Sequence, residues 1–180
     1  TGVLNNDYID KINTLGKEKY GLEKTVLSVD NYEIYLNWDE IYAPGKSVSK
    51  DELLDDIIHI VLKHDGVVDA WVNKKLATAP WPEITKTMFI NGYNAQRGGD
   101  ISVIFRAGWK GGSEQGATHG LWYPYDSHLP LVWMGWNIPH GHTNRRIGMT
   151  DIAPTIAAML KIQMPSGSIG EPILEITDRK

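Results

Sequence analysis

The run Asp100-Ile-Ser-Val-Ile-Phe-Arg106 decides the fold class of this 180-residue chain. Apolar residues fill almost every position between the two charged ends, which is typical of a strand covered on both faces. A second strand candidate, residues 67–72, precedes it, and helical patterns lie on either side of the pair. Strands that alternate with helices of about 10–15 residues favour an α/β fold in which flanking helices cover a layered sheet.

The first half of the chain contains further elements with recognisable boundaries. Alternating apolar residues over 25–39 predict two short strands, or one strand with a turn. Ser49-Lys-Asp-Glu52 forms a capping box and predicts the start of a helix that is ended by His64-Asp-Gly66. Two more helices are expected over residues 6–20, ended by Gly21, and over residues 82–92, with Pro82 in the first turn.

The second half is expected to add one strand and one helix. Residues 129–136, Leu-Pro-Leu-Val-Trp-Met-Gly-Trp, are a short apolar run that predicts a buried strand. Thr150 is the expected cap of a last helix over residues 151–160. Its apolar residues Ile152, Ile156, Met159 and Leu160 are expected to face inward.

Composition excludes several functional classes. The chain is 42% hydrophobic and 22% charged, with a formal net charge of -4, and it has no basic block that would recruit nucleic acid or anionic lipid. We therefore expect neither nucleic acid nor a membrane as a partner. The chain contains no run of 18 apolar residues, so the sequence predicts no membrane-spanning helix. The absence of cysteine excludes disulfides and thiolate metal sites.

The six histidines are the first candidates for metal chemistry. His59 and His64 lie five apart on a predicted helix, about 140° round its axis, and cannot share one ion; each is interpreted as a partly exposed helical residue. His140 and His142 lie in a Pro/Gly loop that favours a solvated turn. His119 and His128 flank one aromatic loop and are the better candidates, although a loop histidine also commonly fills space.

The spacing alone does not complete a metal site. A catalytic zinc needs about three protein ligands and a water, and only one or two of these imidazoles can converge. The carboxylates of Asp126 and Asp151 are available as further ligands, but nothing in the spacing requires them. The aromatic loop over residues 121–125 is open to two interpretations, namely a platform that stacks a ligand and ordinary core packing.

Other catalytic patterns are weaker. None of Ser113, Ser127 and Ser166 lies in a strand–turn–helix elbow, so a hydrolase triad is not favoured. The glycine-rich stretch at residues 108–112 lacks the phosphate-loop pattern and is interpreted as a flexible loop.

Several motifs taken together resemble a known family. They are Gly116-Ala-Thr-His-Gly120, Tyr125-Asp-Ser-His-Leu-Pro-Leu131 and Thr150-Asp-Ile-Ala-Pro-Thr155. The chain around them is similar to the C-terminal part of bacterial alkaline phosphatases with a threonine nucleophile, in the superfamily that includes the nucleotide pyrophosphatase/phosphodiesterases. The resemblance covers roughly residues 30–175, and only the combination of motifs is specific. It implies an α/β fold that is the C-terminal portion of an alkaline-phosphatase-like fold.

The resemblance also implies a site. In that family the histidine of the Thr-His-Gly turn binds one ion of a two-zinc centre, and this role carries over to His119. Thr118, Asp126 and His128 match positions near the site without being assigned as ligands. The family's nucleophilic threonine and its Asp-His pair of zinc ligands precede the matched region, and this chain has no Asp-His dipeptide. We therefore expect no catalytic residue in this chain, at most a partial zinc site, and no activity of the chain alone.

The resemblance further predicts the organisation and setting of the protein. Residues 1–180 are expected to be one domain, cut from a larger phosphatase as the Thr1-Gly2 start suggests, with 1–45 as a peripheral subregion and 46–175 as the core-like segment. The parent enzyme is expected in the periplasm or outside the cell, acting on a phosphate ester. Apolar surface left uncovered by the missing part is expected to favour a homo-oligomer.

Alternative functions stay open at this point. The chain is also compatible with a segment of a nucleotide pyrophosphatase/phosphodiesterase or, less strongly, of a sulfatase-like enzyme. A non-catalytic binding module whose aromatic loop 121–125 grips a sugar or another partner is a different class of function.

Overall fold

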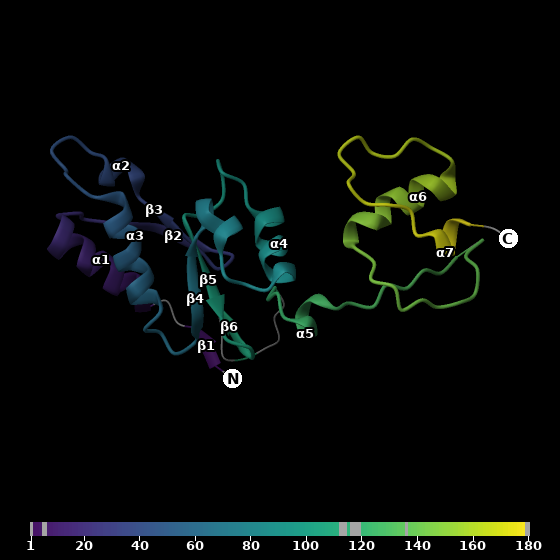
Figure 1. The fold of residues 1–180 in the computed structure, drawn as a ribbon, viewed down its shortest axis with the longest axis horizontal. Coiled ribbons are helices and arrows are strands. Elements are labelled where there is room, and N and C mark those ends of the chain that lie inside the picture. Colours follow the sequence, from purple (N-terminus) through teal and green to yellow (C-terminus); the bar gives the residue numbers. More distant parts are fainter. Residues whose placement is uncertain (1, 5–6, 112–114, 116–119, 136, 179–180) are drawn as a thin grey trace. The chain divides into compact units, whose positions relative to one another are not determined.

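A computed structural model describes residues 2–4, 7–111, 115, 120–135 and 137–178 (Figure 1). Contacts within the chain divide it into two compact units, Thr1–Leu129 and Pro130–Lys180. We refer to them as unit 1 and unit 2 and describe each by itself. The expected division of the chain into a peripheral and a core-like segment remains a prediction. The described residues form no helix that is long and apolar enough to cross a membrane.

A four-stranded sheet is the centre of unit 1. Its order is β2 (Val26–Asp30), β3 (Glu33–Leu36), β5 (Ile101–Phe105) and β4 (Val67–Val72). All three pairings in this sheet are antiparallel. A separate parallel pair joins β1 (Gly2–Leu4) to β6 (Trp109–Gly111). The expected mixed α/β class is confirmed, and the strands predicted at 25–39, 67–72 and 100–106 all form.

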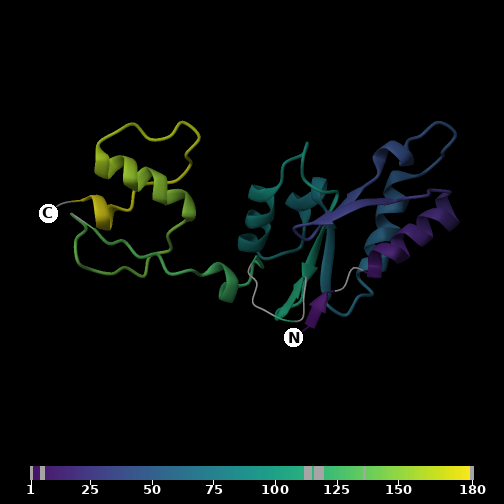
Figure 2. The ribbon, with the colours of Figure 1, turned by 180° about the vertical axis from the view of Figure 1, so that it is seen from behind.

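Helices cover both faces of the sheet, as Figures 1 and 2 show. On one side lie α1 (Asp7–Tyr20) and α3 (Lys50–Val61), and the short α2 (Trp38–Ile41) comes between them along the chain. On the other side lies α4 (Glu83–Gly92), which follows the 3-10 helix η1 (Asn73–Thr78). Ser49 caps α3 by accepting a hydrogen bond from the Glu52 N–H at 3.5 Å, as the capping box predicts.

The central strand β5 is buried at every position. Ile101, Val103 and Phe105 alternate along the strand and belong to one apolar core with residues of α1 and α3, among them Ile12 and Ile57. Ser102 and Ile104 point to the opposite face and are also buried. Coverage of both faces explains why this strand has almost no polar residues, in a sheet that is nevertheless antiparallel.

A buried amide fixes the ends of three strands to one another. Asn73, at 2% exposure, donates through Nδ2 to Glu33 Oε1 at 2.7 Å and to the Gly99 carbonyl at 2.9 Å. Its Oδ1 accepts a hydrogen bond from the Ser102 hydroxyl at 2.6 Å. The carboxylate of Glu33 also accepts from the Gly99 N–H at 2.9 Å. The Asn73 side chain thus uses its two donors and its acceptor, which is how a buried amide becomes tolerable.

A tight turn joins β2 to β3. Asn31 and Tyr32 have φ values of 47° and 66°, and Asp30 pairs with Glu33 across them. Two residues with positive φ between antiparallel strands are typical of a type I′ hairpin. A tyrosine pays a steric cost for this conformation, and the Tyr32 carbonyl accepts a hydrogen bond from the Val103 N–H at 2.9 Å.

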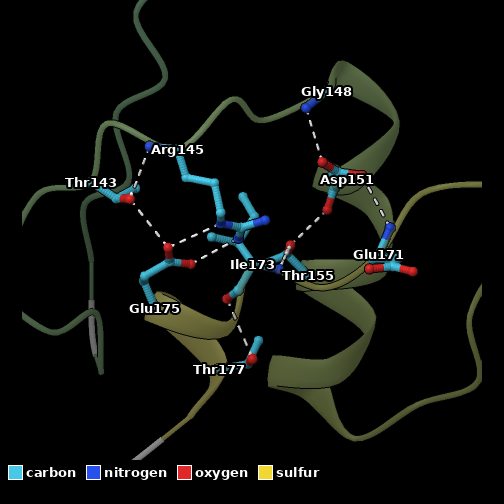
Figure 3. A network of polar contacts seen from close by, with 9 residues as sticks. All are labelled: Thr143, Arg145, Gly148, Asp151, Thr155, Glu171, Ile173, Glu175 and Thr177. Atoms are coloured by element: carbon cyan, nitrogen blue, oxygen red, sulfur yellow. Dashed lines mark hydrogen bonds and ion pairs between the residues drawn. The ribbon is translucent and has the colours of Figure 1, made fainter.

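Unit 2 has little interior of its own. It contains a 3-10 turn, η2 (Met149–Asp151), followed directly by α6 (Ile152–Leu160), and the short α7 (Leu174–Thr177). Among the described residues of unit 2, the buried hydrophobic side chains other than Pro154 are Ala157 and Ile173. Polar contacts hold much of this unit together (Figure 3).

Two carboxylates organise those polar contacts. Asp151 accepts the N–H of Gly148 at 2.9 Å and that of Glu171 at 3.0 Å, and these bonds lower the pKa of its carboxyl. Glu175 pairs with Arg145, whose Nη2 lies 2.8 Å from Glu175 Oε2. The Arg145 hydrogen bonds, with smaller help from the backbone and Thr143, lower the pKa of Glu175 to about 2.

Unit 2 corrects three sequence-based expectations. The described residues 129–135, which begin with the last residue of unit 1, form no strand, and most of their apolar side chains are exposed. Ile156 and Leu160 of α6 face outward, with exposures of 42% and 63%, rather than inward. The helix α6 begins at Ile152, close to the predicted start at residue 151, but its N-cap is Asp151 rather than Thr150. The first two errors have one cause, because an apolar pattern indicates which residues can be buried but not whether a neighbour is present to bury them.

Removing the buried amide should destabilise unit 1. Asn73→Ala leaves the Ser102 hydroxyl and the Gly99 carbonyl without their partner, so we expect the free energy of unfolding to fall by about 2–3 kcal/mol. Urea titration followed by circular dichroism measures the change. Asn91→Ala, at an exposed position of α4, is the matched control and should change the stability by less than about 0.5 kcal/mol. Equal effects of the two substitutions would contradict the role assigned to Asn73.

The Glu175 ion pair predicts a pH dependence in unit 2. Because the pKa of Glu175 is lowered in the folded chain, the pair stabilises the fold above the ordinary carboxyl pKa and is lost as the pH falls toward 2. Carbon NMR of the side-chain carboxyl across a pH titration should show the low pKa directly. Arg145→Gln should return it toward about 4.3, whereas Arg146→Gln should leave it low. A low pKa that persists in Arg145→Gln would refute the assignment.

Candidate functional site

Two of the four site residues expected from the sequence can be placed. His119, the predicted metal ligand, and its neighbour Thr118 lie outside the described residues. Asp126 lies in the short helix α5 (Pro124–Ser127), and His128 directly follows this helix. No group of three or more potential metal ligands is found among the described residues. The assignment of His119 therefore stays a prediction, and the surroundings of its segment carry the structural argument.

Gly111 and Gly120, which lie on either side of His119 in the sequence, are both beside the ring of Tyr32. A Cβ atom placed on Gly111, at the end of β6, would lie 3.5 Å from Tyr32 Cε1. One placed on Gly120 would lie 3.6 Å from the Tyr32 hydroxyl oxygen. Gly120 has a φ of +123°, which side chains rarely adopt. Gly111 and Gly120 therefore both lie close to the same tyrosine.

Three hydrogen bonds hold the chain just after Gly120, and one of them reaches the last residue of β5. The N–H of Leu121, a buried residue, donates to Asp126 Oδ2 at 2.9 Å. The Tyr123 hydroxyl donates to the carbonyl of Phe105, the last residue of β5, at 2.6 Å. The Tyr125 hydroxyl accepts the N–H of Gly108 at 2.9 Å. Three contacts within five residues fix the backbone at Leu121, only two positions beyond His119.

Aromatic rings pack round this anchor. The Trp122 ring meets that of Tyr32 edge-on at 6.4 Å and that of Phe89 in α4 at 5.1 Å between centroids. Tyr32 also meets Phe105 edge-on at 4.7 Å. These separations and tilted geometries are those of favourable aromatic pairs. Of the two interpretations of the loop at 121–125, packing is the one the rings of Trp122 and Tyr123 display, while Tyr125 is 61% exposed.

The local electrostatics favour a neutral phenol beside a charged carboxylate. Burial raises the pKa of Tyr32, and the negative charge of Asp126 raises it further. Burial likewise raises the pKa of Tyr123. Both hydroxyls therefore remain protonated donors at neutral pH. Asp126, whose Oδ2 holds the Leu121 N–H, supports the loop, which is a structural role that the sequence did not distinguish from metal binding.

The remaining candidates lie elsewhere. His128 is exposed, and its N–H donates to the Pro124 carbonyl at 2.9 Å. His140 and His142 are exposed in an irregular segment of unit 2, as the solvated-turn interpretation expects. Ser127, on α5, donates its hydroxyl to the Tyr123 carbonyl at 3.0 Å, and Ser166 is exposed.

His64 differs from its expected environment. It lies beyond the end of α3, and its side chain is only 12% exposed. Nδ1 accepts the Gly66 N–H at 3.2 Å, and Nε2 lies 3.3 Å from Asp7 Oδ1. Its ring meets those of Tyr8 and Trp109 edge-on. His64 therefore ties α1 to β4 and β6, which is a packing role, whereas His59 is exposed on α3 as expected.

Sequence reasoning missed Tyr32 and Phe89 as parts of this environment. Both are distant in sequence from residue 119 and reach the loop only through the fold. A usable signal existed for Tyr32 alone, because asparagine at position 31 is typical of the first residue of a type I′ turn.

Comparison with known proteins identifies the region. No protein-family model matches the chain. An alkaline phosphatase named PafA from Elizabethkingia meningoseptica is 36% identical over 180 residues, covering 99% of this chain and 33% of the relative. The alkaline phosphatase PhoV of Synechococcus elongatus is 39% identical over 149 residues, covering 83% of this chain and 27% of the relative. A Myroides odoratus protein named calcium-transporting ATPase is 41% identical over 163 residues, 89% of this chain and 29% of the relative.

A solved structure agrees. The crystal structure of wild-type PafA matches with a TM-score of 0.90 and 35% identity, over 99% of this chain and 34% of that one. A mutant of the same enzyme gives a TM-score of 0.88. By sequence and by fold, the chain is a phosphatase-like segment. More particularly, it corresponds to the C-terminal part of the bacterial alkaline phosphatases of the PafA and PhoV kind, and it spans about a third of the length of these relatives.

The Asp126 anchor predicts a local effect. Asp126→Ala leaves the N–H of buried Leu121 unpaired, so we expect hydrogen exchange at Leu121 to accelerate about tenfold to a hundredfold, equivalent to about 1.4–2.7 kcal/mol of lost protection. Asp126→Asn keeps an acceptor at this position and should retain most of the protection. Exchange measured by NMR on the 180-residue chain provides the test. Unchanged protection in Asp126→Ala would show that another contact holds the loop.

Proposed function

We propose that this chain is the C-terminal segment of a zinc-dependent alkaline phosphatase that hydrolyses phosphate monoesters through a phosphoryl-threonine intermediate. The observation that carries the proposal is the match to PafA over 99% of the chain in both sequence and structure. The family-specific motifs at residues 116–120 and 150–155 lie inside this match.

His119 is the residue we propose to bind zinc. It is supported by its place in the Thr-His-Gly motif and by the rigid backbone just beyond it, which would hold an imidazole in a fixed position. The described residues do not complete a metal site, because no group of three or more potential metal ligands is found among them. The described residues of this chain therefore supply no catalytic step of their own. In the complete enzyme a zinc pair would act on the attacking and leaving oxygens of the ester.

The proposal accounts for the expected inactivity of the isolated chain. The nucleophilic threonine and the other zinc ligands would come from the part of the enzyme that precedes the matched region. By the same resemblance, the complete enzyme would act in the periplasm or outside the cell on a phosphate ester.

One alternative from the superfamily and one from outside it can be separated from this proposal. A nucleotide pyrophosphatase/phosphodiesterase would prefer a diester, and the name of the Myroides relative suggests ATP as a further substrate to test. A free-standing binding module would need its aromatic loop exposed, whereas Trp122 and Tyr123 are engaged in packing.

A chimera tests the proposal. The present chain replaces the matched third of the Elizabethkingia phosphatase, and hydrolysis of p-nitrophenyl phosphate and bis-p-nitrophenyl phosphate is compared with and without zinc. We expect zinc-dependent hydrolysis that favours the monoester, and no hydrolysis by the isolated chain. His119→Ala should lower kcat/KM on the order of a hundredfold or more and reduce the bound zinc measured by mass spectrometry.

His59→Ala removes an exposed imidazole from α3 and should leave both activity and zinc content unchanged. Full zinc content in the His119→Ala chimera would overturn the assignment of the ligand. A preference for the diester would favour the phosphodiesterase alternative.

A further inference from the structure

Tyr32 has a backbone conformation that a side chain disfavours. It is the second central residue of the turn between β2 and β3, and its φ is 66°. A type I′ turn needs a positive φ at this position and normally has glycine there. For a residue with a side chain, this left-handed conformation costs free energy that glycine avoids. Residues held in such conformations occur mainly at functional sites, where surrounding contacts keep them in place.

The ring of Tyr32 packs against parts of unit 1 that are distant from it in the sequence. It meets the Phe105 ring edge-on at 4.7 Å and the Trp122 ring edge-on at 6.4 Å between centroids. The Trp122 ring in turn lies 5.1 Å from that of Phe89. The Tyr32 carbonyl accepts the Val103 N–H at 2.9 Å. Separate contacts therefore fix the backbone and the ring of this residue.

Two glycines bring the backbone close to this ring. A Cβ on Gly111 would lie 3.5 Å from Tyr32 Cε1, and a Cβ on Gly120 would lie 3.6 Å from the Tyr32 hydroxyl oxygen and 3.9 Å from Cε2. These are van der Waals distances, so a single methyl group would reach from either glycine to the ring. Gly120 also has a φ of +123°, which residues with a side chain rarely adopt.

We propose that Tyr32 is a positioning residue for the zinc ligand assigned at His119. The inference rests on the proposed function, which makes that assignment. Tyr32 acts through Gly120 and Trp122, which follow the ligand along the chain, by limiting where their backbone can lie. In this role it holds the protein backbone and is assigned no contact with zinc or with the substrate. The turn between β2 and β3 is the base that holds its ring.

A role in the turn alone does not explain a tyrosine at this position. A turn that only joined β2 to β3 would be more stable with glycine at position 32, because glycine adopts a positive φ without steric cost. Apolar packing alone is available from a strand position with an ordinary φ, as the fully buried Ile34 shows. A tyrosine held at an unfavourable φ is explained if the place of its ring beside Gly111 and Gly120 is what matters.

Amide exchange tests the positioning role in the 180-residue chain itself. The Leu121 N–H is a suitable probe, because it is hydrogen-bonded to Asp126 and directly follows Gly120. Tyr32→Leu removes the ring, and we expect exchange at Leu121, measured by NMR, to accelerate about threefold to tenfold. Tyr32→Phe keeps the ring and should retain most of the protection.

Tyr32→Gly separates the positioning role from the stability of the turn. Glycine fits the turn without strain, so this variant should unfold at a higher urea concentration than Tyr32→Leu. Leu121 should nevertheless exchange as fast in Tyr32→Gly as in Tyr32→Leu, because both variants lack the ring. If the protection of Leu121 instead followed the global stability of the variants, Tyr32 would be an ordinary structural residue and the proposal would be wrong.

Zinc binding tests the consequence for the ligand. In the chimera described above, Tyr32→Leu and Tyr32→Gly should lower the affinity for zinc about tenfold or more, measured by competition with a chelator. Tyr32→Phe should bind zinc nearly as tightly as the unsubstituted chimera. Tyr42→Leu is the matched control, because Tyr42 is 62% exposed and stacks on Trp38. It should change neither the zinc affinity nor the exchange at Leu121.

These outcomes are separable from those of the proposed function. Loss of zinc in His119→Ala, together with unchanged zinc affinity in Tyr32→Leu and Tyr32→Gly, would overturn the positioning role and leave the proposed function intact. Full zinc content in His119→Ala would instead refute the ligand assignment, while faster exchange at Leu121 would still show that Tyr32 holds this backbone. If the chimera does not fold, the exchange measurements decide, because unchanged protection of Leu121 in Tyr32→Leu would overturn the proposal.

Discussion

Burial of both faces of β5 is the constraint on which unit 1 depends. Because Ile101, Val103 and Phe105 face the helices α1 and α3, the other face of the strand needs a cover of its own. The Asn73 amide meets Ser102 on that face, and α4 follows Asn73 along the chain through η1. The carbonyl of Phe105, at the end of the same strand, receives the Tyr123 hydroxyl. One strand thereby sets the layers of the fold and the anchor of the loop that leads from His119.

The contacts of that anchor restrict the backbone at Leu121, two residues beyond His119. The residues around the loop have no metal-binding constellation among those the structure describes, but they restrict where the backbone enters and leaves. Tyr32 has a φ of 66°, which carries a steric cost for a tyrosine. In this conformation its ring lies beside both Gly111 and Gly120. Strain of this kind persists only where surrounding contacts over-determine it, here through Phe105, Trp122 and the Val103 N–H. A preorganised imidazole needs such a support, since a ligand displaced by about an ångström binds its metal poorly.

The sequence predicted most of unit 1 because its local and tertiary signals agree. Ser49 caps the start of α3 and Gly21 follows the end of α1, and the apolar faces of both helices are buried within unit 1. The alternation at 25–39 matches a hairpin whose two strands, β2 and β3, pair with each other. The environment of the candidate site could not be predicted in the same way. Tyr32, Phe89 and Phe105 meet Trp122 or one another only after folding, and Asp126 has the same chemistry whether it binds a metal or a backbone N–H. The sequence predicts His64 on a helix, whereas α3 ends at Val61. The burial of His64 between α1 and β6 could therefore not be predicted.

Unit 2 shows the opposite relation between pattern and structure. Its hydrophobic pattern predicts a helix and a strand with buried faces, and the helix forms, but Ile156 and Leu160, which are expected to face inward, are exposed. Burying an isoleucine or leucine side chain contributes about 1.5–3 kcal/mol, so leaving several exposed is a large cost for a unit whose interior holds little more than Ala157 and Ile173. Hydrogen bonds through Asp151 and Thr155, and the Arg145–Glu175 pair, preserve its local shape without that contribution. The periodicity of α6 therefore predicts the helix but not which of its faces is buried.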